Sequence, residues 1–186
     1  MRWVNIHCYP LIFQKSRTFL DTSRFRTLLA QYYDVSPRSV HAYILGEHGD
    51  SEVPLWSTAD IGGLPILNNT INGKLFDKPV MDEIFNQVKN AAYRIITKKG
   101  HTNWAIGLVI ASIIRSIKED QRRILPVSVR LNGEYDIDHV CLSLPAIVGL
   151  NGVESHILPK LNTAELEGLQ QSAKTLQEPV NALNLD

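Results

Sequence analysis

The sequence predicts an α+β fold in which a twisted antiparallel sheet packs against long helices. The expected elements run in the order helix, strand, loop, two helices, three strands and helix, so the strands are grouped rather than alternating with helices. The three grouped strands, within residues 127–159, are separated by two Asn-Gly pairs, which favour tight reversals between antiparallel strands. The 186 residues, 44% of them hydrophobic, suit one packed domain, alone or with an appendage.

The chain begins its regular structure with a helix over residues 21–33 and a strand over residues 39–45. The apolar residues of the helix recur at helical spacing, at Phe25, Leu28, Leu29 and Tyr32. The strand alternates, so that one face carries Val40, Ala42 and Ile44 and the other carries His41 and Tyr43. Residues 60–74 contain two adjacent glycines, a proline and an Asn-Gly pair, and we expect a loop there.

Two long helices are expected next. The first begins near Asp77, with Pro79 in its first turn, and ends at residues 98–100. The second begins at Thr102 or Asn103 and is apolar over most of its circumference, which predicts deep burial.

After the three strands, Asn162 and Glu165 form a capping-box pair that predicts the start of a final helix. The apolar stripe of this helix is Leu166, Leu169, Ala173 and Leu176. Pro179 is expected to bend or end it, because proline lacks the backbone N–H that a helix interior needs.

The composition argues against several classes of partner. Nineteen basic residues balance nineteen acidic ones, so neither nucleic acid nor an anionic membrane is an expected partner. No apolar run approaches the roughly 20 residues of a membrane span. With Cys8 and Cys141 as the only cysteines, neither a disulfide framework nor a Cys-rich metal site is expected, and a cytoplasmic location fits. We expect no metal.

The segment GEHGD, at residues 46–50, carries the first candidate chemistry. His48 lies between two glycines and near two carboxylates, directly after the expected strand. A histidine can transfer a proton near neutral pH, glycines let the backbone turn sharply, and a carboxylate can orient an imidazole and favour its charged form. Taken alone, the same pattern is also typical of a polar turn that follows a strand.

Asp21 and Arg24 are the second candidate group. They lie three residues apart at the start of the first helix, on neighbouring parts of one face. An intrahelical ion pair is one interpretation. If Asp21 reached His48, however, a carboxylate–imidazole pair would lie one turn from an arginine, whose planar fork binds a carboxylate through two hydrogen bonds. Such a set could anchor a small acid and move a proton.

Three segments of the chain together resemble the catalytic half of L-lactate dehydrogenases, within the lactate/malate dehydrogenase superfamily. They are LDTSRFR at 20–26, GEHGDSEVPLWS at 46–57 and KKGHTNWAIGL at 98–108, and the spacing between them also fits. The likeness runs from about Thr18 to the C-terminus. It implies a lactate/malate dehydrogenase C-terminal-like domain over residues 18–186, preceded by an unmatched segment at residues 1–17.

The resemblance implies a role for each matching residue. His48 corresponds to the histidine that protonates the pyruvate carbonyl and takes the proton back from lactate. Asp21 corresponds to the carboxylate that orients this imidazole, and Arg24 to the residue that binds the substrate carboxylate. Thr102 corresponds to a small polar residue that lines the substrate pocket. NAD is the implied cofactor, and a small 2-hydroxy or 2-oxo acid is the implied substrate.

Arg26 and His41 match two further positions, which imply regulation. In allosteric bacterial members of the family, an arginine and a histidine at these places bind fructose 1,6-bisphosphate across a subunit interface. A phosphate ester needs clustered cations, and symmetry doubles such a cluster. The resemblance therefore also implies a homo-oligomer. A solvated arginine and a partly buried strand histidine are the alternative interpretation.

The chain departs from the family pattern at its start. Family enzymes are nearly twice as long, and their first half is a dinucleotide-binding fold. The sequence has no Gly-x-Gly-x-x-Gly segment, so we expect the dinucleotide-binding domain to be absent and the cofactor-binding residues are unknown. Where the family has Gly-Ser-Gly-Thr, this chain has Lys-Ser-Arg-Thr at 15–18. Three interpretations stay open: half of a lactate dehydrogenase, half of a malate dehydrogenase, or an inactive structural or regulatory partner of a full-length paralogue.

Overall fold

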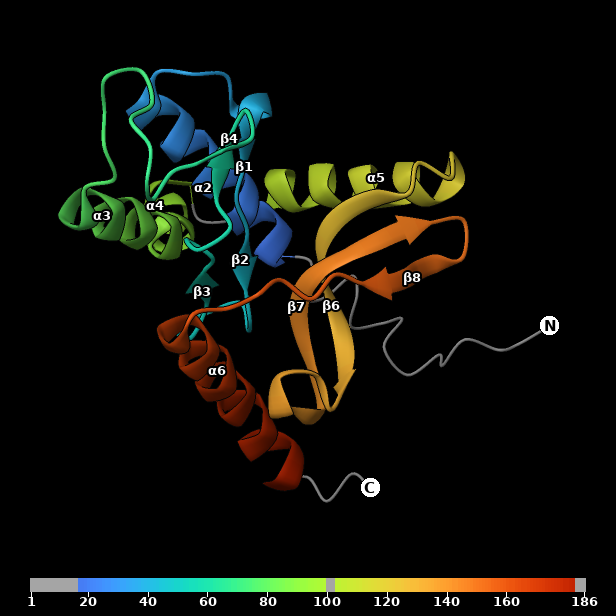
Figure 1. Ribbon diagram of the computed structural model, residues 1–186. Helices are drawn as coiled ribbons and strands as arrows, with labels where there is room; N and C mark the ends of the chain where they lie inside the picture. The colour runs from blue at the N-terminus through green and yellow to red at the C-terminus, as the bar shows by residue number, and fades with distance from the viewer. Residues whose placement is uncertain (1–16, 100–102, 183–186) are drawn as a thin grey trace.

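The computed structural model describes residues 17–99 and 103–182, and its α+β fold agrees with the class predicted from the sequence (Figure 1). Its largest sheet is an antiparallel meander, in the order β6-β7-β8, formed by β6 (Arg123–Asn132), β7 (Asp138–Gly149) and β8 (Gly152–His156). Both reversals expected at the Asn-Gly pairs are present, and a short 3-10 turn, η3 (Glu134–Asp136), follows the first. β6 and β7 are longer than their apolar alternation alone indicated.

Long helices surround this sheet. In the view of Figure 1, α5 (Asn103–Lys118) lies above the sheet and α6 (Thr163–Ala182) lies to its lower left. The helix α2 (Arg17–Tyr33) starts four residues before the first expected turn. The capping box of α6 is confirmed, because the Glu165 N–H donates to the Asn162 side chain and the Asn162 N–H donates to Glu165. The helix continues three residues past Pro179.

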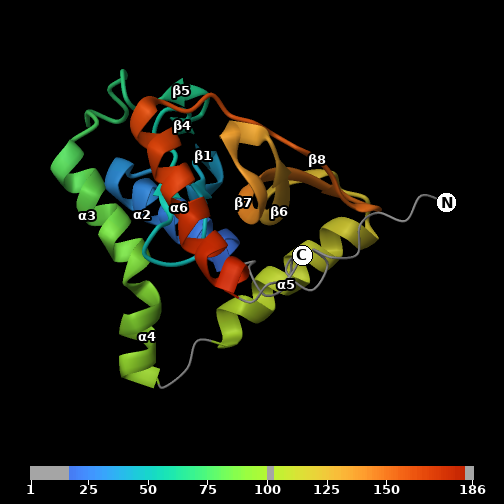
Figure 2. The same cartoon turned by 90° about the horizontal axis from the view of Figure 1, so that it is seen from below.

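The single long helix expected from Asp77 is divided in two. The structure has α3 (Lys78–Lys89) and α4 (Ala91–Lys99), which follow one another along one side of the molecule in Figure 2. Asn90 separates them, and its side-chain amide donates to the Asn86 carbonyl at 2.9 Å. The Asn86 carbonyl thus accepts from both the backbone N–H and the side chain of Asn90, and side-chain bonds of this kind locally disturb a helix.

The strand expected over residues 39–45 is also divided. After a 3-10 turn, η2 (Pro37–Ser39), the structure has β1 (Val40–His41) paired with β4 (Asp60–Ile61), and β2 (Ile44–Leu45) paired with β3 (Val53–Pro54). Between them, the Ala42 carbonyl accepts from Arg26 and the Tyr43 carbonyl accepts from the Leu55 N–H. Ala42 and Tyr43 therefore separate the segment that pairs with β4 from the segment that pairs with β3.

The segment expected as a loop contains a small hairpin. β4 pairs with β5 (Leu64–Pro65) across Gly62 and Gly63, whose φ angles are +60° and +85°. Two successive positive φ angles are the geometry of the tight turns that join antiparallel strands, and glycine adopts them without steric cost. The rest of residues 60–74 is irregular, with one isolated bridge between Ile71 and Lys74.

The buried apolar side chains form two clusters, and α2 contributes to both. One cluster gathers around β6 and β7 with side chains of α5 and α6, and includes Phe19 from the start of α2. The other gathers α2, α3 and the short strands, and includes Phe25, Leu29 and Tyr33 from the rest of α2. The stretch of α2 around Asp21 and Thr22 therefore lies where the two cores meet.

The helix α5 is only partly buried, and the prediction of deep burial was wrong. Val109 and Ile113 pack into the first core, but Trp104 is 85% exposed, Leu108 is 75% exposed and Ile114 is also exposed. One apolar face of this helix has no cover among the described residues. None of the described helices is both long and apolar enough to cross a membrane.

Candidate active site

Asp21 is the buried centre of the candidate site. It lies on α2 and is 2% exposed. Its neighbour Thr22 accepts a hydrogen bond from the Ile44 N–H at 3.0 Å, which ties the start of β2 to this helix. Because β2 is held there, the loop that follows it begins close to Asp21.

The loop that carries His48 is held by two distant elements. Gly46 exchanges two backbone hydrogen bonds with Ser143 of β7, each 3.0 Å long. The Glu47 N–H donates to the Ser172 hydroxyl of α6 at 2.7 Å. Gly46 has a φ of +89°, and a Cβ atom there would lie 2.6 Å from the Ser172 hydroxyl oxygen. Glycine is therefore required for both the turn and the close approach of α6.

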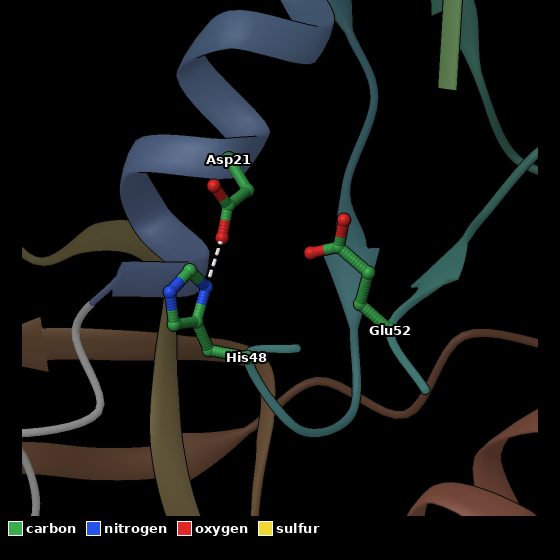
Figure 3. A group of neighbouring side chains, drawn as sticks. All are labelled: Asp21, His48 and Glu52. Carbon is green, nitrogen blue, oxygen red and sulfur yellow. Dashed lines mark hydrogen bonds and ion pairs between the residues drawn. The ribbon is translucent and has the colours of Figure 1, made fainter. Parts of the chain in front are cut away.

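His48 and Asp21 form the expected pair, drawn in Figure 3. His48 Nδ1 lies 2.6 Å from Asp21 Oδ2, and the other carboxylate oxygen accepts from Arg24 Nη1 at 3.2 Å. An ionised carboxylate only accepts hydrogen bonds, so Nδ1 carries the hydrogen of this bond and Nε2 is left to exchange a proton. The three residues that sequence reasoning grouped together are thus connected through Asp21.

Glu52 is part of the same group, although sequence reasoning missed it. It lies directly before β3, is 6% exposed, and neither carboxylate oxygen has a hydrogen-bond partner among the described residues. Burial, and next the charge of Asp21, raise the pKa of Glu52 to about 8. The sequence carries no local signal of this, because the burial comes from elements distant in the chain.

Asp21, His48 and Glu52 also form a group that could in principle hold a metal ion. In the part of the chain that the structure describes, one potential ligand atom from each lies within 4.8 Å of the others. However, both Asp21 oxygens already accept hydrogen bonds, from His48 and Arg24. Arg24 and Lys89 also place positive charge near Glu52. A metal ion would have to displace His48 or Arg24 from the Asp21 oxygens, and it would be repelled by the positive charges of Arg24 and Lys89. The arrangement therefore favours a proton over a metal ion.

The remaining candidate residues lie away from this group or outside the described residues. Arg26 Nε donates to the Ala42 carbonyl at 2.8 Å, and its guanidinium lies 4.7 Å from the centre of the Tyr43 ring. His41 Nδ1 lies 3.1 Å from Asp60 Oδ1. Arg26 therefore contacts the backbone of the residue that follows His41 in the chain. Thr102 lies outside the residues that the structure describes.

The antiparallel sheet and the long helices form an α+β domain that carries a buried carboxylate–imidazole pair, Asp21 and His48. Residues 18–184 match the lactate/malate dehydrogenase, alpha/beta C-terminal domain. The chain belongs to the lactate/malate dehydrogenase family.

Named relatives and solved structures agree with this assignment. The chain is 56% identical over 161 residues to an L-lactate dehydrogenase of Salinibacter ruber, and the match covers 87% of this chain and 51% of the relative. A minor L-lactate dehydrogenase of Enterococcus mundtii superposes with a TM-score of 0.85 at 39% identity, covering 91% of this chain and 54% of that one. The structure of a malate dehydrogenase of Salinibacter ruber superposes with a TM-score of 0.81 at 34% identity, and the match covers 89% of this chain and 53% of that one. The chain thus spans about half the length of these proteins.

Proposed function

We propose that this chain is the substrate-binding and proton-transfer half of an NAD-dependent L-lactate dehydrogenase. His48 donates a proton to the carbonyl oxygen of pyruvate and takes it back from lactate, Asp21 orients the imidazole, and Arg24 binds the substrate carboxylate. The observation that carries the proposal is the 2.6 Å contact between His48 Nδ1 and a buried Asp21. This contact leaves Nε2 as the atom that exchanges the proton.

Arg24 is placed to act as the carboxylate anchor. Its side chain is largely buried and is held one helical turn from Asp21 by the 3.2 Å contact. A guanidinium held in this way offers further N–H groups in a planar fork, which matches a carboxylate. A substrate carboxylate bound there would lie beside the imidazole that exchanges the proton. Thr102, as a further residue of the substrate pocket, stays a prediction.

The chemistry assigned to this chain is limited to acid binding and proton transfer. Reduction of a ketone also needs a hydride at the carbonyl carbon, which a nicotinamide supplies in this family. The sequence has no glycine-rich loop between a strand and a helix to cradle a dinucleotide. By itself, the chain is therefore expected to show negligible NADH-dependent reduction of pyruvate and no NADH binding at micromolar concentrations.

Two other interpretations remain, and identity favours lactate over malate. The named lactate dehydrogenase of Salinibacter ruber is 56% identical to this chain, whereas the malate dehydrogenase structure from the same organism is 34% identical. The non-enzymatic alternative is a structural or regulatory partner of a full-length paralogue. The exposed apolar face of α5 supports association in either case, with a paralogue or with further copies of this chain.

A fusion experiment tests the proposed activity. This chain would be fused behind the dinucleotide-binding half of a full-length family lactate dehydrogenase, and reduction of pyruvate and of oxaloacetate would be followed through NADH. We expect reduction of pyruvate in preference to oxaloacetate. His48→Asn should lower kcat by several powers of ten, and Arg24→Lys should chiefly raise KM. Arg38→Lys, an exposed change on η2, is the control. A fusion whose activity does not depend on His48 contradicts the proposal.

Arg26 and His41 carry a second, regulatory proposal. The contact of Arg26 with Ala42, the residue after His41, supports this proposal, whereas the Asp60 carboxylate beside His41 opposes a bound phosphate. We expect the chain to bind fructose 1,6-bisphosphate and Arg26→Gln to bind it more weakly. Calorimetric titration of the chain and of Arg26→Gln checks this. Equal binding by both proteins would remove Arg26 from the effector site.

A further inference from the structure

Glu52 is a buried carboxyl group that lacks the hydrogen bonds such a group normally has. Figure 3 shows its side chain reaching from the segment before β3 toward Asp21 on α2. Both of its oxygens are buried and neither has a hydrogen-bond partner among the described residues. Burying a polar group without a partner costs free energy, and burying a charged one costs more. Packing alone therefore does not account for a glutamate at this position.

The charges around Glu52 come from several elements. Asp21 on α2 and Glu47 in the loop are negative, whereas Arg24 on α2 and Lys89 on α3 are positive. The imidazole of His48 also lies close to the Glu52 carboxyl group, within 4.8 Å. Burial and the nearby Asp21 carboxylate raise the pKa of Glu52, and they outweigh the two cations. At neutral pH, the group beside the Asp21–His48 pair is consequently a neutral carboxylic acid.

We propose that Glu52 is a positioning residue for the Asp21–His48 pair, which sets how tightly His48 holds its proton. While Glu52 is neutral, one carboxylate faces the imidazole. When Glu52 releases its proton to solvent, a second negative charge stands within 4.8 Å of the pair and stabilises the imidazolium. A more stable imidazolium is a weaker proton donor. The neutral form of Glu52 thus keeps His48 effective as the acid, and this part of the inference rests on the proposed function.

Nuclear magnetic resonance of the intact chain tests the inference without any turnover. The ring signals of His48, assigned by their loss in His48→Gln, would be followed from about pH 5.5 to about pH 9.5. The unaltered chain should show an inflection near pH 8 that reports the ionisation of Glu52. Glu52→Gln, which has the shape of the neutral acid and no proton to lose, should lack that inflection.

A matched control uses the neighbouring acid Glu47. Because the charge of Glu47 adds to the pKa shift of Glu52, Glu47→Gln should keep the alkaline inflection of His48 and move it to lower pH. A merely structural role for Glu52 would not produce an inflection with this behaviour. Identical His48 titrations in the unaltered chain and in Glu52→Gln would overturn the inference.

A second measurement needs no variant. The side-chain carboxyl carbons of ¹³C-labelled glutamates in the unaltered chain would be titrated over the same range. One glutamate should titrate near pH 8, and its absence would overturn the inference even if Glu52→Gln failed to fold. Neither readout depends on pyruvate or NADH, so a failed fusion experiment and a failed titration remain distinguishable.

Discussion

At the scale of single residues, Asp21 connects the parts of the site. One of its oxygens accepts from His48 and the other from Arg24, and the residue is almost fully buried. Removing either partner would leave the buried charge less compensated, which is more costly than losing an exposed ion pair. The same pairing fixes the imidazole tautomer. Stability and the proposed proton transfer therefore both depend on these contacts.

Glu52→Gln should change how stability depends on pH. The unfolded glutamate titrates near 4.5 and the folded one near 8. Between these values the unfolded chain releases the proton and the folded chain keeps it, so the stability of the unaltered chain falls as pH rises, by at most about 1.4 kcal/mol per pH unit. The decline stops above about pH 8. Glutamine has no such proton, so the stability of the variant relative to the unaltered chain should increase as the pH rises from about 4.5 to about 8.

Chemical denaturation at about pH 5.5, 7 and 8.5 measures this advantage. The control is Glu167→Gln, an exposed glutamate on α6. It should leave the pH dependence of unfolding as in the unaltered chain. If Glu52→Gln and the unaltered chain lost stability in parallel over the whole range, Glu52 would be ionised in the folded protein.

Gly46→Ala should destabilise the chain by about 1–3 kcal/mol. Alanine would be strained at a φ of +89°, and its methyl group would lie only 2.6 Å from the Ser172 hydroxyl oxygen. Gly62→Ala is the control, because Gly62 also has a positive φ but has no atom within 4 Å of the added carbon. Thermal denaturation should show a larger loss for Gly46→Ala. Adding Ser172→Ala should recover part of that difference, and purely additive effects would contradict the contact.

The contact between Asp21 and His48 could be predicted from sequence only when several motifs were considered together. The glycines around His48, and Arg24 one turn from Asp21, each allow a simpler interpretation, and the resemblance to a family joined them. Glu52 could not be predicted, since its neighbours Asp50 and Ser51 make the segment resemble a polar turn. The charges that act on it include Asp21 on α2 and Lys89 on α3, which donates to the Asp50 carbonyl. Such contacts are tertiary, and spacing along the chain does not reveal them.

At the scale of elements, α6 supports the loop that carries His48. Its first turn is anchored by Glu165, which accepts from the Ser57 N–H, the Ser57 hydroxyl and the Asn162 N–H. Two turns later, Ser172 holds Glu47 in place. The position of His48 therefore depends on how α6 begins.

Glu165→Ala should cost about 2 kcal/mol of unfolding free energy, because it removes the charge-assisted bonds that Ser57 and Asn162 donate to a buried carboxylate. It should also disturb the His48 ring signals, because Ser172 would shift with the helix. Denaturation and the His48 spectrum measure the two effects. Glu167→Ala, an exposed change on the same helix, is the control and should alter neither. An undisturbed His48 signal in Glu165→Ala would show that α6 does not support the loop.

The elements differ in how far their sequences predicted them. The order of the helices and of the meander follows from apolar periodicity and the Asn-Gly turns, and α6 from its capping box. The strand over residues 39–45 was divided by contacts of Ala42 and Tyr43 with distant residues, and the long helix was divided at Asn90. The burial of α5 was overestimated, because periodicity shows which residues are apolar but not what covers them.

At the scale of the whole molecule, the exposed face of α5 should control association. Single soluble molecules seldom expose large contiguous apolar patches. We expect the isolated chain to self-associate or aggregate at tens of micromolar, and Trp104→Lys combined with Leu108→Lys to shift it toward the monomer. Sedimentation velocity measures this. Leu75→Lys is the control, since Leu75 is 63% exposed but lies on a loop before α3. If the unaltered chain sedimented as a single monomeric species at this concentration, the predicted self-association would be wrong.

The tether between Glu47 and Ser172 has a consequence for the order in which the chain is made. The two residues are 125 positions apart, so the ribosome adds Ser172 long after the histidine loop has been synthesised. At roughly 5–20 residues per second, the interval is about 6–25 s. Until β7 and then α6 have been synthesised, the loop lacks the contacts with Ser143 and Ser172 that hold it. The proposed proton-transfer site is therefore among the last parts of the nascent protein to reach its final structure.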